Sequence, residues 1–482
     1  MVRARKEREK FTVIVETLDQ EGRGVSRRDG KVVFIEGALP GEEVTYERYR
    51  NKPSFELGLA TDLLTESPLR VTPKCPYFGV KDGSCGGCAM QHIEPRAQVA
   101  VKQKVLMDAL WHIGRVRPEQ VIPPIFGLTW HYRHRARLSV RDVAKKGTVL
   151  VGFHEKRSSY IADMKSCEIL PKKVSDLLVP LRDLIASLTI RQKLAQIEVA
   201  CTEDCTAFVL RILEQPSAED EAKIKAFEKE HDVVVWYQPK GPDSIYPLEL
   251  ENADRLKLRH RETNVAITFK PTDFTQVNHV LNELMVSRAL RMLKLDHDCK
   301  VVDFFCGLGN FTLPIATKVK QVIGIEGSQA LVDRAKEGAE QNGLADKTDF
   351  VARNLFDWKD EDWDAIWKSI GGIDRVLIDP PREGAMAVCQ SFANTEQRPK
   401  RLVYVSCNPA TLARDAAILV REGGWHLRSA GVMNMFPHTA HVESIAVFEP
   451  GPKPVQQDPI EEMELQEISE GAQAEDAQTN GS

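Results

Sequence analysis

Residues 301–310 read Val-Val-Asp-Phe-Phe-Cys-Gly-Leu-Gly-Asn, and this stretch decides the fold class of the C-terminal part of the chain. Its apolar first half is typical of a buried parallel strand, because helices cover both faces of such a strand. Gly307 and Gly309 permit a tight turn and a close approach of the backbone to a ligand. The next residues, Phe311-Thr-Leu-Pro314, begin a predicted helix. A strand, a glycine turn and a helix in this order open a doubly wound α/β sheet.

The same pattern recurs along residues 276–450. Apolar runs that we interpret as parallel strands alternate with helical segments, and two further strands complete the sheet. The predicted parallel strands are residues 301–305, 321–325, 373–378 and 402–406, and the last two strands are residues 425–435 and 442–448. We therefore predict one α/β domain over residues 276–450, with its ligands at the carboxyl edge of the sheet.

The residues at this edge favour one type of cofactor. Glu326 ends the second predicted strand, 23 residues after Asp303, where a carboxylate can accept hydrogen bonds from both hydroxyls of a ribose. The sequence lacks a third glycine at the spacing that a dinucleotide pyrophosphate requires, which disfavours a nicotinamide cofactor. The combination favours S-adenosylmethionine, whose sulfonium needs no phosphate-binding loop.

Candidate catalytic residues follow later strands at the same edge. Asp379-Pro-Pro-Arg382 forms a rigid loop, and Asp-Pro-Pro in this place is typical of enzymes that methylate bases. Cys407 follows the predicted strand of residues 402–406 and precedes Asn408-Pro409, so we expect its thiol to face the cleft as a nucleophile. Glu443 opens the last strand, where a buried carboxylate is costly unless it is used. His441 shares its side of the strand.

Four of the ten cysteines have the spacing Cys-x9-Cys-x2-Cys-x78-Cys, and they are Cys75, Cys85, Cys88 and Cys167. Disulfides are not expected in a reducing compartment, so these thiols are candidate metal ligands. Four thiolates can hold zinc or a [4Fe–4S] cluster. Structural zinc more often uses two Cys-x2-Cys pairs, and the single pair here favours iron–sulfur. The Cys-x3-Cys-x2-Cys pattern of radical enzymes is absent, so we interpret the cluster as structural.

The net charge of −5 hides a basic segment. Residues 451–482 contain eight acidic residues and one lysine, a net of −7, so the other 450 residues carry +2. Residues 96–166 contain fourteen Lys or Arg against five Asp or Glu, a local +9. Such a patch favours an RNA partner, although a solvated basic surface is the alternative.

Alternating arginines make the RNA prediction more specific. Arg133, Arg135 and Arg137 would face one side of a strand as a row matched to phosphates. Nearby aromatic residues would offer stacking surfaces for bases. These aromatic residues are Trp130, Tyr132, Phe153 and Tyr160.

The remaining segments complete the predicted organisation. Residues 11–68 contain short β-rich runs between glycine turns, which suits a small OB-like barrel that either binds RNA or only packs on the enzyme. Residues 1–10 are a basic arm, and residues 69–275 form a mixed central domain that carries the cysteines. Residues 451–482 form an acidic tail without aromatic residues, and we expect them to be disordered.

Taken as a set, these motifs resemble the RNA uracil-5-methyltransferase family over residues 11–450. The resemblance implies the class I fold of S-adenosylmethionine-dependent methyltransferases, and the N-terminal barrel resembles the TRAM domain, an RNA-binding module. The segments that carry the resemblance are Phe274–Asn278, Asp303–Thr312, Asp379–Arg382, Ser406–Pro409 and His438–Ser444.

The resemblance also implies individual roles and a substrate. Cys407 would add to C6 of a uracil and Glu443 would remove the C5 proton. Barrel and cysteine cluster together resemble the branch that carries a [4Fe–4S] cluster and modifies 23S ribosomal RNA at uridine 1939, with another 23S uridine or transfer RNA as alternatives. The usual first cysteine gap is shorter, and residues 81–84 look like an insertion. The implied contacts of S-adenosylmethionine are Gln276, Phe305, Asn310, Glu326, Asn354 and Asp379.

Two other classes of function compete with this interpretation. One is a methyltransferase that acts on an exocyclic nitrogen through Asp379-Pro-Pro and needs no cysteine. The other is a non-catalytic RNA-binding protein that retains a relict cofactor fold. The N-terminus has no apolar signal segment, and no apolar stretch is long enough to span a bilayer. We therefore expect a cytoplasmic monomer without a membrane partner.

Overall fold

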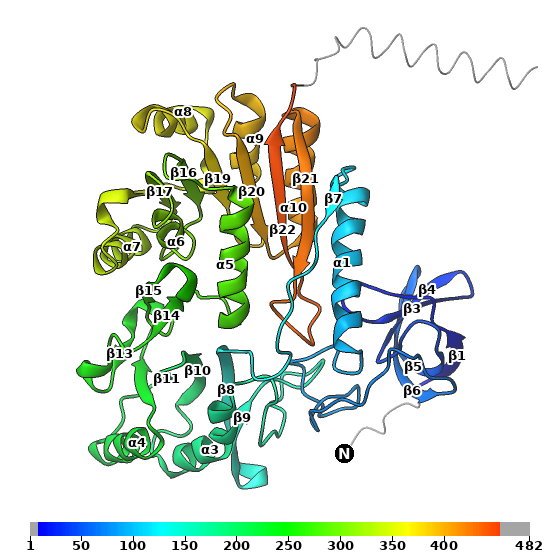
Figure 1. Cartoon of the computed structure of the whole chain (residues 1–482). Helices are drawn as coiled ribbons and strands as arrows, with labels where there is room; N and C mark the ends of the chain where they lie inside the picture. The colour runs from blue at the N-terminus through cyan, green and yellow to red at the C-terminus, as the bar shows by residue number, and fades with distance from the viewer. Residues whose placement is uncertain (1–7, 454–482) are drawn as a thin grey trace, which may run out of the picture.

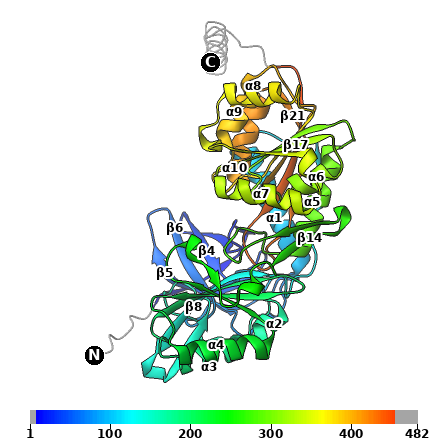
Figure 2. The same cartoon turned by 90° about the vertical axis from the view of Figure 1, so that its left-hand side faces the viewer.

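The computed structural model describes residues 8–453, whose strands form four sheets (Figure 1). Residues 1–7 of the predicted basic arm and residues 454–482 of the predicted acidic tail lie outside the described residues. In chain order the sheets have six, six, two and eight strands. The C-terminal sheet and its helices occupy one end of the molecule, and the other sheets lie toward the opposite end (Figure 2). None of the helices within residues 8–453 is both long and apolar enough to cross a membrane.

The N-terminal sheet closes into a small barrel. Its strands are β1 (Lys10–Ile14), β2 (Thr17–Leu18), β3 (Gly24–Arg28), β4 (Lys31–Glu36), β5 (Glu43–Asn51) and β6 (Phe55–Leu63). The strand order is β1-β5-β6-β4-β3-β2, so the two edge strands are neighbours in the chain and one segment completes both edges. Val33, Ile35, Val44 and Tyr46 are fully buried inside. Closure of this kind removes the open edges of a small sheet.

A long helix separates the barrel from the C-terminal sheet. Residues 64–94 form turns and isolated bridges, and α1 (Pro95–His112) follows them. The Glu94 side chain accepts a hydrogen bond from the backbone N–H of Ala97 at 2.8 Å, and Pro95 is pre-set for the first helical position. Beyond α1, β7 (Gln120–Val121) joins the far edge of the C-terminal sheet. Helix α1 therefore packs on that sheet and also faces the barrel (Figure 1).

The central part is a mixed sheet with helices on one side. Its strands and helices are β8 (Arg135–Val143), β9 (Thr148–Gly152), α2 (Lys172–Asp176), α3 (Leu178–Ser187), β10 (Leu194–Cys201), β11 (Thr206–Ile212), α4 (Ala218–His231), β12 (Val234–Gln238) and β13 (Tyr246–Pro247). The strand order is β13-β12-β11-β10-β8-β9. A hairpin of β14 (Lys257–His260) and β15 (Val265–Thr268) then leads to the C-terminal part.

The C-terminal part is the doubly wound α/β sheet that the sequence predicts. Its elements are α5 (His279–Leu293), β16 (Lys300–Phe304), α6 (Thr312–Ala316), β17 (Gln321–Glu326), α7 (Gln329–Gln341), β18 (Thr348–Ala352), α8 (Asp360–Ser369), β19 (Arg375–Ile378), α9 (Met386–Asn394), β20 (Arg401–Ser406), α10 (Pro409–Ala417), β21 (Trp425–Met433) and β22 (Glu443–Pro450). The order β18-β17-β16-β19-β20-β22-β21-β7 reverses direction beside β16. Ligands of such sheets bind outside the carboxyl ends of the strands at this switch point.

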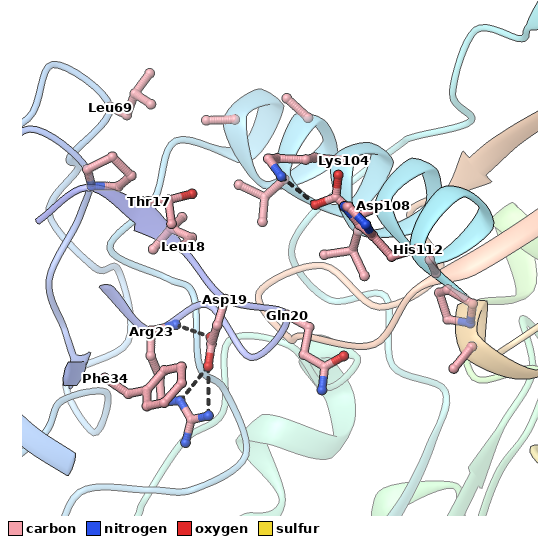
Figure 3. Close-up of a pocket in the computed structure, with 18 of the residues that line it drawn as sticks. Thr17, Leu18, Asp19, Gln20, Arg23, Phe34, Leu69, Lys104, Asp108 and His112 are labelled. Carbon is pink, nitrogen blue, oxygen red and sulfur yellow. Dashed lines mark hydrogen bonds and ion pairs between the residues drawn. The ribbon is translucent and has the colours of Figure 1, made fainter. Parts of the chain in front are cut away.

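A groove of about 1050 Å³ runs between the barrel and α1, and we call it the α1 groove (Figure 3). Its charged side chains are largely paired, because Arg23 binds Asp19 and Lys104 binds Asp108. Figure 3 shows these pairs on opposite walls of the groove. The third wall is Asn408, Pro409 and Ala410, which directly follow the predicted nucleophile. The barrel, α1 and the start of α10 therefore border one space.

Candidate active site

The chain turns sharply where β16 ends at the switch point. Phe305 has φ of +64°, and Gly307 and Gly309 have φ of +55° and +90°. Positive φ is uncommon for a side chain such as phenylalanine, whereas glycine adopts it without strain. No other described atom lies within 4 Å of the place where a Cβ on Gly307 would stand. The turn thus leaves its backbone open to a ligand.

One cavity of about 520 Å³ lies against this turn. Its walls come from the loop before α5 and from the ends of β16, β17, β18, β19, β20 and the start of β22. The cavity brings together every residue that the sequence predicts as catalytic or cofactor-binding. These residues are Gln276, Phe305, Asn310, Glu326, Asn354, Asp379, Cys407 and Glu443.

Glu326 is fixed beside the glycine turn. Its Oε2 accepts a hydrogen bond from the backbone N–H of Gly307 at 3.1 Å, and its Oε1 accepts one from Ser328 at 3.2 Å. Each carboxylate oxygen has further lone pairs, so both can still accept hydrogen bonds from a ligand. A carboxylate held in this way at the end of the second strand fits the two hydroxyls of a ribose.

Amide and aromatic side chains complete this half of the cavity. Asn310 exchanges two hydrogen bonds with Asn282 of α5, at 2.9 and 3.0 Å, which fixes its side chain. Asn354 accepts a hydrogen bond from the N–H of Phe356 at 3.1 Å. The rings of Phe305 and Phe356 meet edge to face at 5.9 Å. Apolar walls with a few fixed polar groups fit the adenosyl part of S-adenosylmethionine.

Cys407 and Glu443 lie at the other half of the cavity, where β20 ends and its antiparallel neighbour β22 begins. Glu443 is only 3% exposed, and burial, with a smaller contribution from Asp379, raises its pKa to about 8. Burial raises the pKa of Asp379 to about 7. Burial, followed by the Glu443 and Asp379 carboxylates, raises the pKa of Cys407 to about 12. A cation in this cavity would favour the charged forms of all three groups.

Comparison with known families shows to which of them this chain belongs. A family model for tRNA (Uracil-5-)-methyltransferase matches residues 124–449. The chain belongs to this family. A second model, the TRAM domain, matches residues 4–45 of this methyltransferase, where most of the barrel lies. The predicted family membership and enzyme class are therefore confirmed.

Individual relatives of this methyltransferase are similar over nearly the whole chain. It is 55% identical over 438 residues to the 23S rRNA (uracil(1939)-C(5))-methyltransferase RlmD of Bordetella avium, which covers 90% of both chains. The RlmD of Nitrosospira multiformis is also 55% identical, over 91% of this chain and 98% of its own. The crystal structure of Pyrococcus abyssi tRNA (uracil-54, C5)-methyltransferase with S-adenosyl-L-homocysteine has a TM-score of 0.67 at 22% identity, and covers 91% of this chain and 100% of that one. That similarity shows a shared fold.

Sequence reasoning about this methyltransferase missed two cationic residues. Arg382 lines the cavity, and its charge lowers the pKa of both Cys407 and Glu443. Its place directly after Asp379-Pro-Pro could have indicated this role. Lys102 of α1 also acts on Glu443, from outside the cavity lining, and no sequence pattern links two residues so far apart.

The four predicted metal-ligating cysteines of the methyltransferase are gathered, but a metal site is not shown. Cys75, Cys85, Cys88 and Cys167 line one small cavity in the central part. Burial raises the pKa of Cys88 to about 11 and that of Cys167 to about 12. Within residues 8–453, no group of three or more His, Cys, Asp or Glu side chains is placed to hold a metal ion.

The prediction that Arg133, Arg135 and Arg137 form a row on one side of a strand is wrong. Strand β8 begins only at Arg135, so Arg133 lies outside it. Arg135 donates a hydrogen bond to the carbonyl of Pro271 at 2.6 Å and is turned into the protein. Arg137 alone is largely exposed, at 68% of its side chain, and it pairs with Glu198 at 2.8 Å. Local strand periodicity could not reveal that the chain after Pro271 covers Arg135.

Three of the four aromatic residues predicted to stack on RNA bases have internal contacts instead, and one of them, Phe153, packs on the central core beside the cysteines. Tyr132 is 3% exposed, and its hydroxyl donates to the carbonyl of Pro437 at 2.8 Å. Trp130 stacks on His438 with ring centroids 4.0 Å apart. Both therefore support the segment that leads to Glu443, whereas Tyr160 is 67% exposed.

Proposed function

We propose that this methyltransferase transfers a methyl group from S-adenosylmethionine to C5 of a uridine in 23S ribosomal RNA, of the uridine 1939 type, through a covalent adduct at Cys407. The observation that carries the proposal is the single cavity shared by Cys407, Glu443 and the six expected cofactor contacts. The names of the 55% identical relatives support the choice of nucleotide.

Cys407 would start the reaction as the nucleophile. C5 of uracil is a weak nucleophile, so direct methylation is slow. Addition of the Cys407 thiolate to C6 forms a C–S bond and leaves an enolate whose carbanion character lies at C5. Arg382 favours the thiolate, because it is a cation beside the thiol in a cavity that also holds two buried carboxyl groups. Bound S-adenosylmethionine supplies an electrophilic methyl group for C5.

Glu443 would complete the reaction as the general base. After methylation, C5 still carries its proton. The Glu443 carboxylate takes that proton, the C5–C6 double bond re-forms, and the C6–S bond breaks to release Cys407. A base with a pKa near working pH suits this step, and burial raises the pKa of Glu443 to about 8. Asp379 lies beside both groups and would hold the substrate in register.

The α1 groove offers a path for the RNA to this cavity. It begins at the barrel that the TRAM model matches and ends at Asn408, next to Cys407. Arg96 and Lys104 are exposed along its α1 side, where they can contact phosphates. The target base must leave any stack to enter the cavity. We propose that the strand lies across this groove and that the uridine is turned into the site.

We also propose that the four gathered thiols hold an iron–sulfur cluster with a structural role. The donor set is all cysteine, which fits such a cluster. Metal analysis and anaerobic absorbance of freshly purified protein would test this, and stoichiometric zinc without iron would overturn it.

Transfer RNA is the second candidate substrate, because the family model and the Pyrococcus abyssi relative are named for it. The decisive experiment incubates the protein with labelled S-adenosylmethionine and either unmodified 23S ribosomal RNA or transfer RNA, and then maps 5-methyluridine. We expect one labelled uridine in 23S ribosomal RNA. Label in transfer RNA alone would reassign the substrate, and label on an exocyclic nitrogen would refute the covalent mechanism.

A further inference from the structure

Lys102 is a buried lysine at the back of the candidate active site. It projects from the middle of α1 and is 2% exposed, whereas lysines are almost never fully buried unless paired. It lies 332 residues before its partner Asn434 in the sequence, so only the tertiary fold brings α1 to this place. A lysine kept in such surroundings calls for a reason beyond packing.

The Lys102 ammonium is bonded to the turn that precedes the base. Its Nζ donates hydrogen bonds to Oδ1 of Asn434 and to the carbonyl of Phe436, both at 2.8 Å. These bonds use two of the three ammonium donors. The turn Asn434–His438 leads within five residues to Glu443, so Lys102 fixes the segment from which the carboxylate enters the cavity.

Hydrogen bonds that hold the turn Asn434–His438 in place do not by themselves require a charged donor. Gln98, one helical turn earlier on the same face of α1, also binds this turn, because its Oε1 accepts a hydrogen bond from the N–H of His438 at 2.8 Å. Its Nε2 donates to the carbonyls of Met90 and Ile93. A neutral amide thus performs the fastening at one position, and the positive charge of Lys102 needs a separate explanation.

Glu443 supplies that explanation. Burial lowers the pKa of Lys102 to about 7, and the Glu443 charge opposes this shift. In turn, the Lys102 charge lowers the pKa of Glu443, against burial and Asp379. The other charged or titratable groups that act on Glu443, Cys407 or this turn are Asp379, Arg382, His438 and His441.

We propose that Lys102 is a positioning residue for Glu443, which fixes the turn before it and supplies the positive charge that keeps its carboxylate ready to take the C5 proton. The inference rests on the proposed function, because it assumes that Glu443 is the base. It adds helix α1, which lies outside the α/β sheet, to the parts of the chain that control the elimination step.

Two substitutions of Lys102 distinguish the effect of its hydrogen bonds to the turn from the effect of its charge. Lys102→Gln keeps hydrogen-bond donors for Asn434 and Phe436 but removes the charge, and Lys102→Met removes both. A matched control is Lys336→Gln, on an exposed position of α7. For each protein, a single-turnover reaction with a 23S ribosomal RNA fragment and S-adenosylmethionine would follow the covalent adduct on denaturing gels, together with 5-methyluridine formation and S-adenosylmethionine affinity.

We expect both Lys102 variants to form the adduct at a rate within about threefold of the unsubstituted protein and to resolve it at least about tenfold more slowly at neutral pH. Loss of the neighbouring cation raises the pKa of Glu443 further, so the pH dependence of elimination should move upward. A purely structural role would instead weaken S-adenosylmethionine binding and adduct formation together. Wild-type elimination with an unshifted profile in Lys102→Gln would overturn the inference.

If the Lys102 variants fail to fold, Asn434→Asp provides a second test. The new carboxylate would pair with the Lys102 ammonium, so that the lysine charge would no longer act on Glu443. We therefore expect slower elimination with the same upward shift in pH dependence. An unchanged profile in this variant would equally reject the inference. Failure of the proposed function itself would look different, because the unsubstituted protein would then form no covalent adduct.

Discussion

Cys407 and Glu443 line one cavity at the end of an antiparallel strand pair. Ser406 of β20 pairs with Ser444 of β22; Cys407 directly follows the first of these residues, and Glu443 directly precedes the second. Ser444 also donates a hydrogen bond to the carbonyl of Ser406 at 3.2 Å, which secures the last pair. The sheet itself therefore brings the Cys407 thiol and the Glu443 carboxyl group to neighbouring positions at one edge of the cavity.

Replacing Cys407 should separate binding from chemistry. We expect Cys407→Ala to bind S-adenosylmethionine as before, since its thiol lies in the other half of the cavity from Glu326, but to form no RNA adduct and no 5-methyluridine. Calorimetry and denaturing gels measure the two outcomes. Cys389→Ala, at a fully buried cysteine of α9, is the matched control and should remain active. Turnover by the Cys407 variant would exclude the covalent route.

Replacing Glu443 should stop the reaction after methyl transfer. Glu443→Gln keeps the shape of the side chain but cannot accept the C5 proton, so a methylated covalent RNA adduct should accumulate. A denaturation-resistant band that carries label from S-adenosylmethionine would show it. If the variant released free 5-methyluridine at the normal rate, another group would be the base.

Glu326 should determine cofactor affinity. We expect Glu326→Gln to weaken S-adenosylmethionine binding by about tenfold, equivalent to about 1.4 kcal/mol, because one strong acceptor for the ribose is lost. Calorimetry would measure the change. Glu337→Gln, on the exposed face of α7, is the control. Equal affinities in the two variants would remove Glu326 from the cofactor site.

Asp303 should make the stability of the protein depend on pH. It is fully buried, and burial raises its pKa to about 8, from an ordinary value of 3.8. Between these values the unfolded chain has released a proton that the folded state retains, so this group makes stability fall as pH rises from about 4 to 8. In this pH range, Asp303→Asn should make the free energy of unfolding fall less steeply with pH, by up to about 1.4 kcal/mol per pH unit.

Thermal unfolding at several pH values would measure the effect of Asp303. Asp349→Asn on β18 is the control, because that residue is exposed. An identical decline of the unfolding midpoint in all three proteins would contradict the assignment.

Arg137 and Arg135 should behave differently although they are two residues apart. Arg137 is exposed, so Arg137→Gln should reduce the salt dependence of RNA affinity by about one charge if it contacts a phosphate. Arg135 holds the segment before Gln276, so Arg135→Gln should weaken cofactor binding and leave the salt dependence unchanged. Binding titrations over a range of salt would distinguish these outcomes, and an unchanged slope for Arg137→Gln would place it outside the interface.

The fold and the cavity could be predicted because their signals are local. Apolar runs such as Val301–Phe305 predict buried strands, and the residues that follow these runs must meet at one edge of a parallel sheet. Strand β18 gives no such signal, because its edge position leaves most of Thr348–Ala352 partly exposed.

The remaining features depend on contacts between distant segments. The burial of Arg135 by residues near Pro271, the contact of Tyr132 with Pro437, and the position of Lys102 behind Glu443 leave no periodic pattern in the sequence. Pattern reasoning assigns a side chain to a face of its own element, but it cannot say which segment covers that face.

Strand β22 is the last strand that the structure describes, and it lies between β20 and β21. It both opens with Glu443 and completes the sheet that holds Cys407 in place. The proposed base therefore stands at the start of a strand that must be inserted between two others before the sheet is complete. Any change that keeps β22 out of the sheet should therefore displace Glu443 and loosen the support of Cys407 at the same time.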